Sequence, residues 1–229
     1  MSNELTTFQI DNLPIVSDQL FGELAQMSQG SDFLPRIQLV TKGKYVDLGK
    51  LPPGHWGVPI PGGDEIEDLG TSIDVIPFAF RPKALDVSDK AAIVSNYDIT
   101  SDEFKRIQAA PKNTGCMWGP TFLVLERNTE KLYELFFGNA SGRQEAGKLR
   151  PFLPGAKSPS PSPATLSVRY KKTPQYSWHV PVVTPCSEPF SSGPPKEEIV
   201  KAIERFMAMK GGIEKASAEE TAQQTKRAR

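Results

Sequence analysis

The segment GPTFLVLERNTEKLYELFFG (residues 119–138) indicates which class of fold this chain adopts. Two runs rich in β-forming residues flank the polar sequence Arg-Asn-Thr-Glu-Lys, and this pattern predicts a β-hairpin. On its N-terminal side, Gly and Pro separate further runs of the same type, namely FLPRIQLV, KYVDLGKL, HWGVPI and SIDVIPFAFRPKALD. We therefore expect a chain built mainly from antiparallel strands.

A second hairpin is predicted by TLSVRYKKTPQYSWHVPVV (residues 165–183). Regular alternation places Tyr170 with the apolar residues of the first strand, and the basic residues Arg169 and Lys171 on the opposite face. We expect Tyr176 and Trp178 of the second strand to join the packed face. The basic side chains would then point to solvent without an aromatic neighbour from their own hairpin.

Three helices are expected among the strands. ITSDEFKRIQAA contains a Thr-x-x-Glu capping box, Thr100 and Glu103, followed by apolar residues at helical spacing. ASGRQEAGKLRPFL indicates a short basic helix, and PPKEEIVKAIERFMAMK an amphipathic helix with Pro at its start. The order does not favour a doubly wound sheet, and a helix between the first strands and a following hairpin is the order of OB-folds. We predict a mainly β fold with inserted helices, an OB-like antiparallel β-barrel with elaborations and a C-terminal helix.

The composition divides the chain into four parts. The N-terminal residues carry four acids and no base, whereas the last residues have little apolar surface to bury. The tract PGAKSPSPSPA is neither helix nor central strand, so it is expected to be an exposed loop. The predicted parts are an acidic N-terminal arm (1–30), an OB-like β-barrel domain (31–190), a C-terminal amphipathic helix (191–210) and a disordered tail (211–229).

Charge and cysteine content narrow the classes of partner. Twenty-seven basic residues balance 27 acidic ones, so nucleic acid or membrane would have to be recognised by a local patch. No apolar run approaches the roughly 18 residues of a membrane helix, and the N-terminus does not read as a secretory signal. Cys116 and Cys186 do not suggest a disulfide framework or a zinc site. We expect a cytoplasmic protein without metal or cofactor.

The sequence contains none of the common catalytic motifs for nucleotide binding, acyl transfer or zinc-dependent hydrolysis. We therefore expect no enzyme and no catalytic residues. The acidic run GGDEIEDLG is interpreted as a charged surface turn, since it lies between Gly-Gly and a predicted strand. The alternative, a metal-dependent nuclease, stays open, because such enzymes gather carboxylates around a cation.

Basic residues gather in one part of the neutral chain and lie beside aromatic residues of predicted strands. Between Arg143 and Lys172 there are seven bases and one acid, a local excess of six. Cations that follow phosphates and rings that stack on bases are the means of binding single-stranded nucleic acid. The candidate contact residues, with Trp56, Phe80 and Trp118 expected to form the stacking floor, are Lys42, Lys44, Tyr45, Trp56, Phe80, Arg81, Lys83, Trp118, Arg143, Lys148, Arg150, Arg169, Lys171, Lys172 and Trp178.

Several segments in one order resemble a group of tailed-bacteriophage early proteins that are read as single-stranded DNA-binding proteins with an OB-type core. The similar segments are FLPRIQLV, DVIPFAFRPKALD, SDEFKRIQ, GCMWGP and WHVPVVTPC, and they span residues 33–190. The resemblance implies a protein of the host cell cytoplasm that coats single strands in phage replication or recombination. It also implies replication or recombination proteins as partners, and it is compatible with an oligomer.

The end of the chain departs from this resemblance. Proteins of that function commonly finish in an acidic tail that recruits partners, whereas this chain ends in QQTKRAR. We hypothesise that the acidic N-terminal arm recruits partners in place of such a tail. A non-catalytic structural or adaptor protein of a phage assembly remains an alternative, in which the Pro-rich loops and the amphipathic helix would be assembly contacts.

Overall fold

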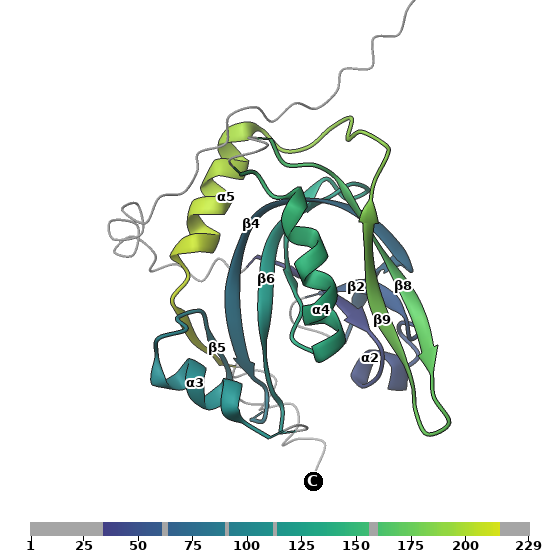
Figure 1. Ribbon diagram of the computed structural model, residues 1–229, viewed down its shortest axis with the longest axis vertical. Coiled ribbons are helices and arrows are strands. Elements are labelled where there is room, and N and C mark those ends of the chain that lie inside the picture. The colour runs from purple at the N-terminus through teal and green to yellow at the C-terminus, as the bar shows by residue number, and fades with distance from the viewer. Residues whose placement is uncertain (1–33, 61–63, 90–91, 112–113, 156–159, 216–229) are drawn as a thin grey trace, which may run out of the picture.

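The computed structural model describes residues 34–60, 64–89, 92–111, 114–155 and 160–215 (Figure 1). The predicted acidic arm and most of the predicted tail lie outside these residues. The described helices are α2 (Lys44–Asp47), α3 (Asp102–Ala109), α4 (Ala140–Leu149), continued by a 3₁₀ turn (Arg150–Phe152), and α5 (Lys196–Ala208). The described strands are β1 (Arg36–Val40), β2 (His55–Pro59), β3 (Ile66–Gly70), β4 (Ser72–Asp86), β5 (Ala92–Asn96), β6 (Cys116–Glu126), β7 (Lys131–Phe136), β8 (Ala164–Lys172), β9 (Ser177–Pro185) and β10 (Gly211–Lys215).

The ten described strands form one mixed sheet in the order β10-β5-β4-β6-β7-β1-β2-β3, with β8 and β9 branching from β4. Only the β1–β7 pair is parallel. One edge of β4 pairs with β6 over most of its length. Its other edge pairs with β8 near the start, at Ser72–Val75, and with β5 at the end, at Ala84–Asp86.

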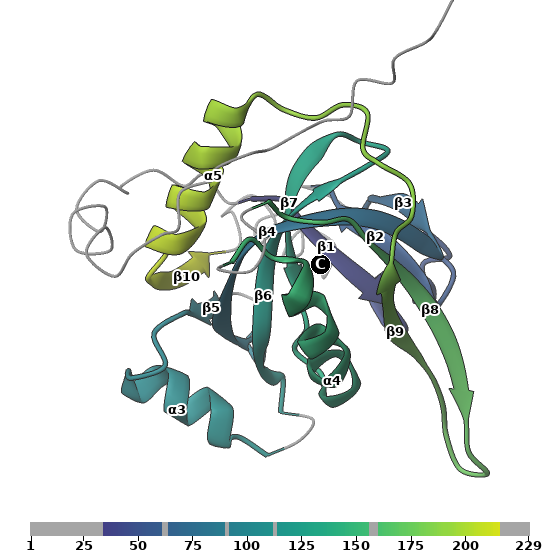
Figure 2. The same cartoon turned by 45° about the horizontal axis from the view of Figure 1, so that its top comes forward.

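The prediction of a mainly β chain with inserted helices is confirmed, whereas a closed OB-like barrel is not. The sheet stays open because β4 is long enough to hold partners at both ends of one edge, and these partners diverge (Figures 1 and 2). Residues 211–215, predicted as part of a disordered tail, form β10 and pair with β5.

Helices cover both faces of the central strands (Figure 2). The segment TFLVL of β6 sends alternate side chains to opposite sides. Phe122 and Val124 pack into a core with α4 and strands β1, β2, β4, β7, β8 and β9, while Leu123 and Leu125 pack beneath α5. All four side chains are fully buried, and each contributes about 1.5–3 kcal/mol of hydrophobic stabilisation.

The local signals for helices agree with the structure, with one shift. Helix α3 begins one residue later than the predicted capping box implies, because Ser101 is its N-cap and its hydroxyl accepts a hydrogen bond from the backbone N–H of Phe104. Thr100 instead donates to the carboxylate of Asp98. The predicted basic helix is α4, whose N-cap Asn139 accepts from the backbone N–H of Gly142. No helix in the described ranges is long and apolar enough to cross a membrane.

Candidate nucleic-acid interface

The outer half of the β8–β9 hairpin projects from the body of the protein (Figures 1 and 2). We refer to residues 169–179 as the hairpin arm. Residues 169–178 are all exposed, although β8 and β9 remain paired through this stretch. The tip is closed by the backbone N–H of Thr173, which donates to the carbonyl of Tyr176, while the Thr173 hydroxyl accepts from the Tyr176 N–H. The arm is therefore an ordered two-stranded element whose surface is open to a ligand.

The pairing register decides which side chains share a face of the arm. Lys171 lies opposite Trp178, and Tyr170 lies opposite His179. Since directly paired residues of antiparallel strands point to the same side, Trp178 stands beside Lys171, on the face that also carries Arg169. Tyr170 and Lys172 lie on the other face. The prediction that the basic side chains lack an aromatic neighbour from their own hairpin is therefore wrong.

The three aromatic side chains predicted to pack are exposed instead. The exposed fractions are 55% for Tyr170, 70% for Tyr176 and 36% for Trp178. The physical reason is the length of the hairpin: Leu166, near its root, is fully buried in the core, but the outer residues extend past the body. Alternation predicts which side chains share a face of a strand. It does not predict how far along the strand the body of the protein covers that face.

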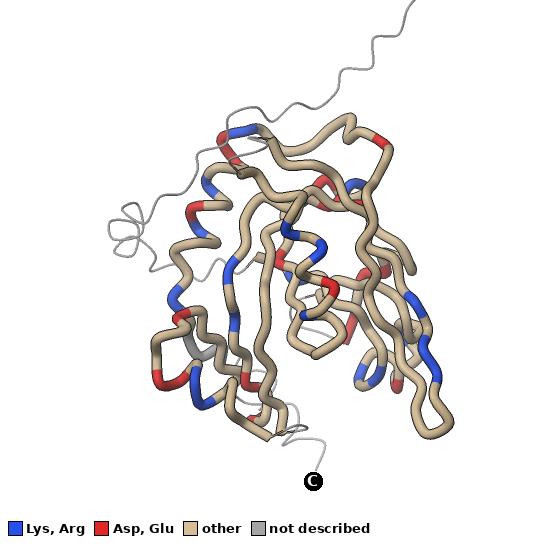
Figure 3. Tube along the Cα trace, in the orientation of Figure 1, with Lys and Arg blue, Asp and Glu red and all other residues tan. Residues whose placement is uncertain are grey.

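Three cations accompany these rings. Arg169, Lys171 and Lys172 follow one another along β8 (Figure 3), and residues 164–187 contain no acid. None of the three forms an ion pair with a described residue. Their charges are therefore available to an anionic ligand, which is the property that a phosphate-binding surface needs.

The root of the arm lies against the turn that precedes β2. The rings of Tyr170 and His179 are 5.1 Å apart between centroids, and they are tilted by 51°. His179 also lies against Gly54, where an added Cβ would come within 2.7 Å of the imidazole. Gly54 has a φ of +90°, a conformation that glycine adopts without strain. This close contact fixes the direction in which the arm leaves the sheet.

A second basic group lies between β1 and β2. Lys42 and Lys44 are exposed, and the ammonium of Lys44 is 5.8 Å from the ring centroid of half-buried Tyr45. Lys44 also forms an ion pair of 2.5 Å with Asp64. Part of this group's charge is therefore neutralised by the acidic run GGDEIEDLG, and it is a weaker candidate for phosphate contacts than the arm.

Two other acids of that run, Glu65 and Asp68, are paired in the same way. Glu65 accepts from Lys50 at 2.6 Å, and this hydrogen bond raises the pKa of Lys50. Partial burial opposes ionisation of Asp68, but hydrogen bonds from His55 and Gly70 outweigh it and lower the pKa of Asp68. These pairs agree with a charged surface turn. Within the described ranges, no three His, Cys, Asp or Glu side chains lie close enough to hold a metal ion.

A third group of predicted residues lies where α4 meets the sheet. Arg143 stacks on Trp118 at 4.4 Å and donates to the carbonyls of Trp118 and Gly138. Arg150 stacks on half-buried Phe80 at 4.2 Å. Each ring thus has a guanidinium over one face, so these residues serve first to hold α4 on the sheet.

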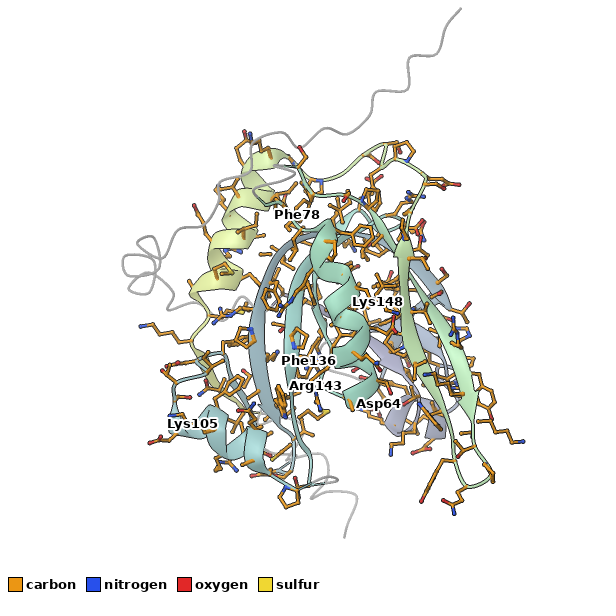
Figure 4. All side chains as sticks on the ribbon, viewed as in Figure 1. Asp64, Phe78, Lys105, Phe136, Arg143 and Lys148 are labelled. Carbon is orange, nitrogen blue, oxygen red and sulfur yellow. The ribbon has the colours of Figure 1, made fainter. Side chains whose placement is uncertain are left out.

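Two further cations of the candidate set interact with groups of the protein itself. Lys148 is exposed on α4 and paired with Glu145 of the same helix at 2.9 Å (Figure 4). Arg81 donates to the carbonyls of Phe206 and Met207 at the end of α5, and burial lowers its pKa to about 10. Arg81 therefore caps a helix and lies beneath it.

Two of the predicted contact residues are buried. Trp56 is 1% exposed and belongs to the core, so it is not an open stacking surface. Lys83 is 2% exposed, and its ammonium donates to both carboxylate oxygens of Glu134 at 2.8 and 2.9 Å. The hydroxyls of Thr121 and Tyr97 also donate to the Glu134 carboxylate. The sequence did not reveal the pair, because Glu134 lies on a different strand of the sheet.

Of the candidate set, only Arg169, Lys171, Lys172 and Trp178 meet on one exposed element. The sequence interpretation left Tyr170 and Tyr176 out of the set. The turn sequence Thr-Pro-Gln-Tyr could have given their register, because a four-residue turn with Pro at its second position pairs Lys172 with Ser177. It could not have given their exposure, which depends on how far the hairpin extends past the body.

Comparison with known proteins does not assign a function to this interface. No protein-family model, no curated protein and no solved structure matches the chain. The function is therefore argued from the residues of the interface.

Proposed function

We propose that this chain binds single-stranded DNA without sequence preference, through the hairpin arm. The observation that carries the proposal is the combination of three exposed aromatic rings with three cations on one projecting hairpin that contains no acid, where none of the cations is ion-paired with a described residue. The cations would neutralise phosphates along one strand. The rings would stack on bases, which contributes about 1–3 kcal/mol per base and is tolerant of sequence.

The arrangement favours single strands over duplexes. Bases in a duplex already stack on their neighbours, so they offer no free face to Tyr170, Tyr176 or Trp178. The arm also places rings on both of its faces, since Tyr170 and Trp178 point to opposite sides. A flexible strand can reach both faces, whereas a stiff duplex cannot. A role in phage replication or recombination, in the host cytoplasm and with proteins of those processes, belongs to this proposal through the resemblance alone.

The test is a titration of fluorescently labelled oligo-dT with the full-length protein at two salt concentrations. We expect binding to oligo-dT, weaker binding to a duplex of the same length, and affinity that falls as salt rises. A parallel titration with labelled oligo-U shows whether RNA binds equally well. Absence of oligo-dT binding at low salt would overturn the proposal.

A matched pair of variants locates the contact. Replacing Tyr170 and Trp178 together by Ala removes rings from both faces of the arm, and because both are exposed the fold should persist. Ile60 and Ile99, which are also large and exposed, provide the control when both are replaced by Ala. Binding lost only in the arm variant supports the proposal, and equal loss in both variants contradicts it.

A further inference from the structure

A pocket lies at the root of the hairpin arm, where the sheet has a notch. Strand β7 ends at Phe136, which pairs with Thr121 of β6, whereas β6 begins earlier in the chain at Cys116. On the other side, β1 pairs with β7 only through Arg36 and Ile37 and then continues to Val40. The pocket is bounded by the free stretches of β1 and β6 and has a volume of about 320 Å³.

The lining of the pocket is mixed, with Gln38 and Asn139 beside apolar and aromatic side chains. Leu39, Met117, Phe136 and Phe137 line it, and the fully buried Trp56 contributes to its inner wall. The indole N–H of Trp56 is buried and has no hydrogen-bond partner among the described residues. A pocket of this size with aromatic side chains and a few polar groups in its lining suits a small planar ring.

One cation lines the same pocket. Arg36 is half-buried, and its guanidinium makes no hydrogen bond or ion pair with any described residue. No acidic side chain is among the lining residues. A partly desolvated guanidinium without a counter-ion favours an anion, and its planar fork fits the oxygens of a phosphate.

We propose that this pocket binds one nucleotide unit, with the base against the aromatic wall and the phosphate at Arg36. The two features together select this chemistry, because a neutral ring would leave the cation unpaired and a bare phosphate would leave the apolar wall empty. Binding is non-covalent and needs no cofactor.

The pocket is continuous with the hairpin arm. Pro181 of β9 lines it and lies on the same face of the hairpin as His179 and Tyr170, because residues two apart share a face and Tyr170 pairs with His179. Two residues of a strand span about 7 Å. Neighbouring nucleotides of one strand can therefore occupy the pocket and stack on Tyr170. This assignment to a strand rests on the proposed function, whereas nucleotide binding by the pocket does not.

The tryptophan content allows a direct assay. The chain has three tryptophans, so Trp118→Phe with Trp178→Phe leaves Trp56 as the only indole. In this background, thymidine monophosphate and oligo-dT are titrated while Trp56 emission is recorded. We expect a saturable quenching with both ligands, and none with deoxyribose phosphate, which has no base.

Two variants test the location. Arg36→Gln should weaken the affinity for thymidine monophosphate by about tenfold, the effect of about 1.4 kcal/mol. Leu39→Phe should fill the pocket and reduce binding further. Lys105→Gln, on α3 away from the arm, removes the same charge as Arg36→Gln and should have no effect (Figure 4). Thermal unfolding checks that each variant is folded.

The outcomes separate this inference from the proposed function. Quenching by thymidine monophosphate, with no binding of labelled oligo-dT to the unsubstituted protein, supports a free-nucleotide pocket and refutes the function. Binding of oligo-dT without any response of Trp56 overturns the pocket and leaves the function intact. Quenching that survives both Arg36→Gln and Leu39→Phe also overturns the pocket.

Discussion

Replacing Arg169, Lys171 and Lys172 together by Gln tests the electrostatic part of the hairpin arm. All three side chains are exposed, and none forms an ion pair with a described residue, so their removal should not disturb the fold. The change acts on binding alone. It therefore isolates the contribution of phosphate neutralisation from that of stacking.

The magnitude follows from the number of cations. For single strands, each neutralised phosphate contributes about −0.7 to the slope of log affinity against log salt concentration. Three contacts account for a slope of about −2.1. Taking this electrostatic contribution to the affinity as zero at 1 M salt, a tenfold dilution to 0.1 M raises the affinity by about two log units. We expect the triple variant to bind oligo-dT about 100-fold more weakly at that salt concentration.

The assay is fluorescence anisotropy of labelled oligo-dT over a series of salt concentrations. The slope and intercept are taken from a plot of log affinity against log salt concentration. Replacing Lys105, Lys131 and Lys201 by Gln is the matched control, since it lowers the net charge of the chain equally from other exposed sites. A triple arm variant with the wild-type slope would refute the reasoning. A control that loses as much slope would show that net charge, and not the arm, attracts the strand.

Three further changes test separate parts of the molecule. Trp178→Ala should weaken oligo-dT binding by about 1–3 kcal/mol in the same titration while leaving the salt slope unchanged, since it removes a ring and no charge. Lys83→Met should lower the free energy of unfolding by about 3–5 kcal/mol in urea denaturation, because Glu134 is left buried without its partner. Asp86→Asn should lower the same free energy by about 1–3 kcal/mol at pH 7, and this difference should shrink as pH falls below 3.8.

The pH dependence of the last change has a definite sign. Hydrogen bonds from Ser88 and Arg106 hold the pKa of Asp86 well below its usual range. The stabilisation is complete above the unfolded-state pKa of 3.8 and is lost as pH falls through the lower folded-state pKa. An equal loss of stability at pH 7 and at pH 2 would contradict this cause. For the buried pair, Lys83→Met combined with Glu134→Leu should be less destabilising than Lys83→Met alone, and an equal or larger loss would contradict the role of an unpaired charge.

Local sequence patterns predicted the helices and strands better than they predicted which strands pair with one another. The β6–β7 hairpin, α3, α4 and α5 follow from β-rich runs, caps and helical spacing that operate over a few residues. The choice between an open and a closed sheet depends on which distant strands share an edge of β4. Ser72–Val75 pairs with β8, about 90 residues away, and no local pattern specifies that contact. The OB-like barrel was inferred from the order of elements, which is compatible with either outcome.

The candidate site shows the same division. The basic character of the arm could be predicted, since Arg169, Lys171 and Lys172 lie close together in the sequence. The burial of Lys83 could not, because it depends on Glu134 from another strand. The exposure of Tyr170 depends on how far the hairpin extends past the body, which is a property of the assembled sheet. Strand propensity assigns aromatic rings to cores by default, and a projecting hairpin is the exception.

The independence of the hairpin arm from the core has a consequence for how such a protein diversifies. Beyond Ser167, the residues of β8 have ladder partners only in β9. Lengthening both strands by two residues would preserve every existing face and add one more layer of side chains on each side. Inserting one residue in a single strand would turn its outer side chains to the opposite face. The footprint on a ligand can therefore grow or shrink in paired steps, under selection for ligand length, while the folded body remains unchanged.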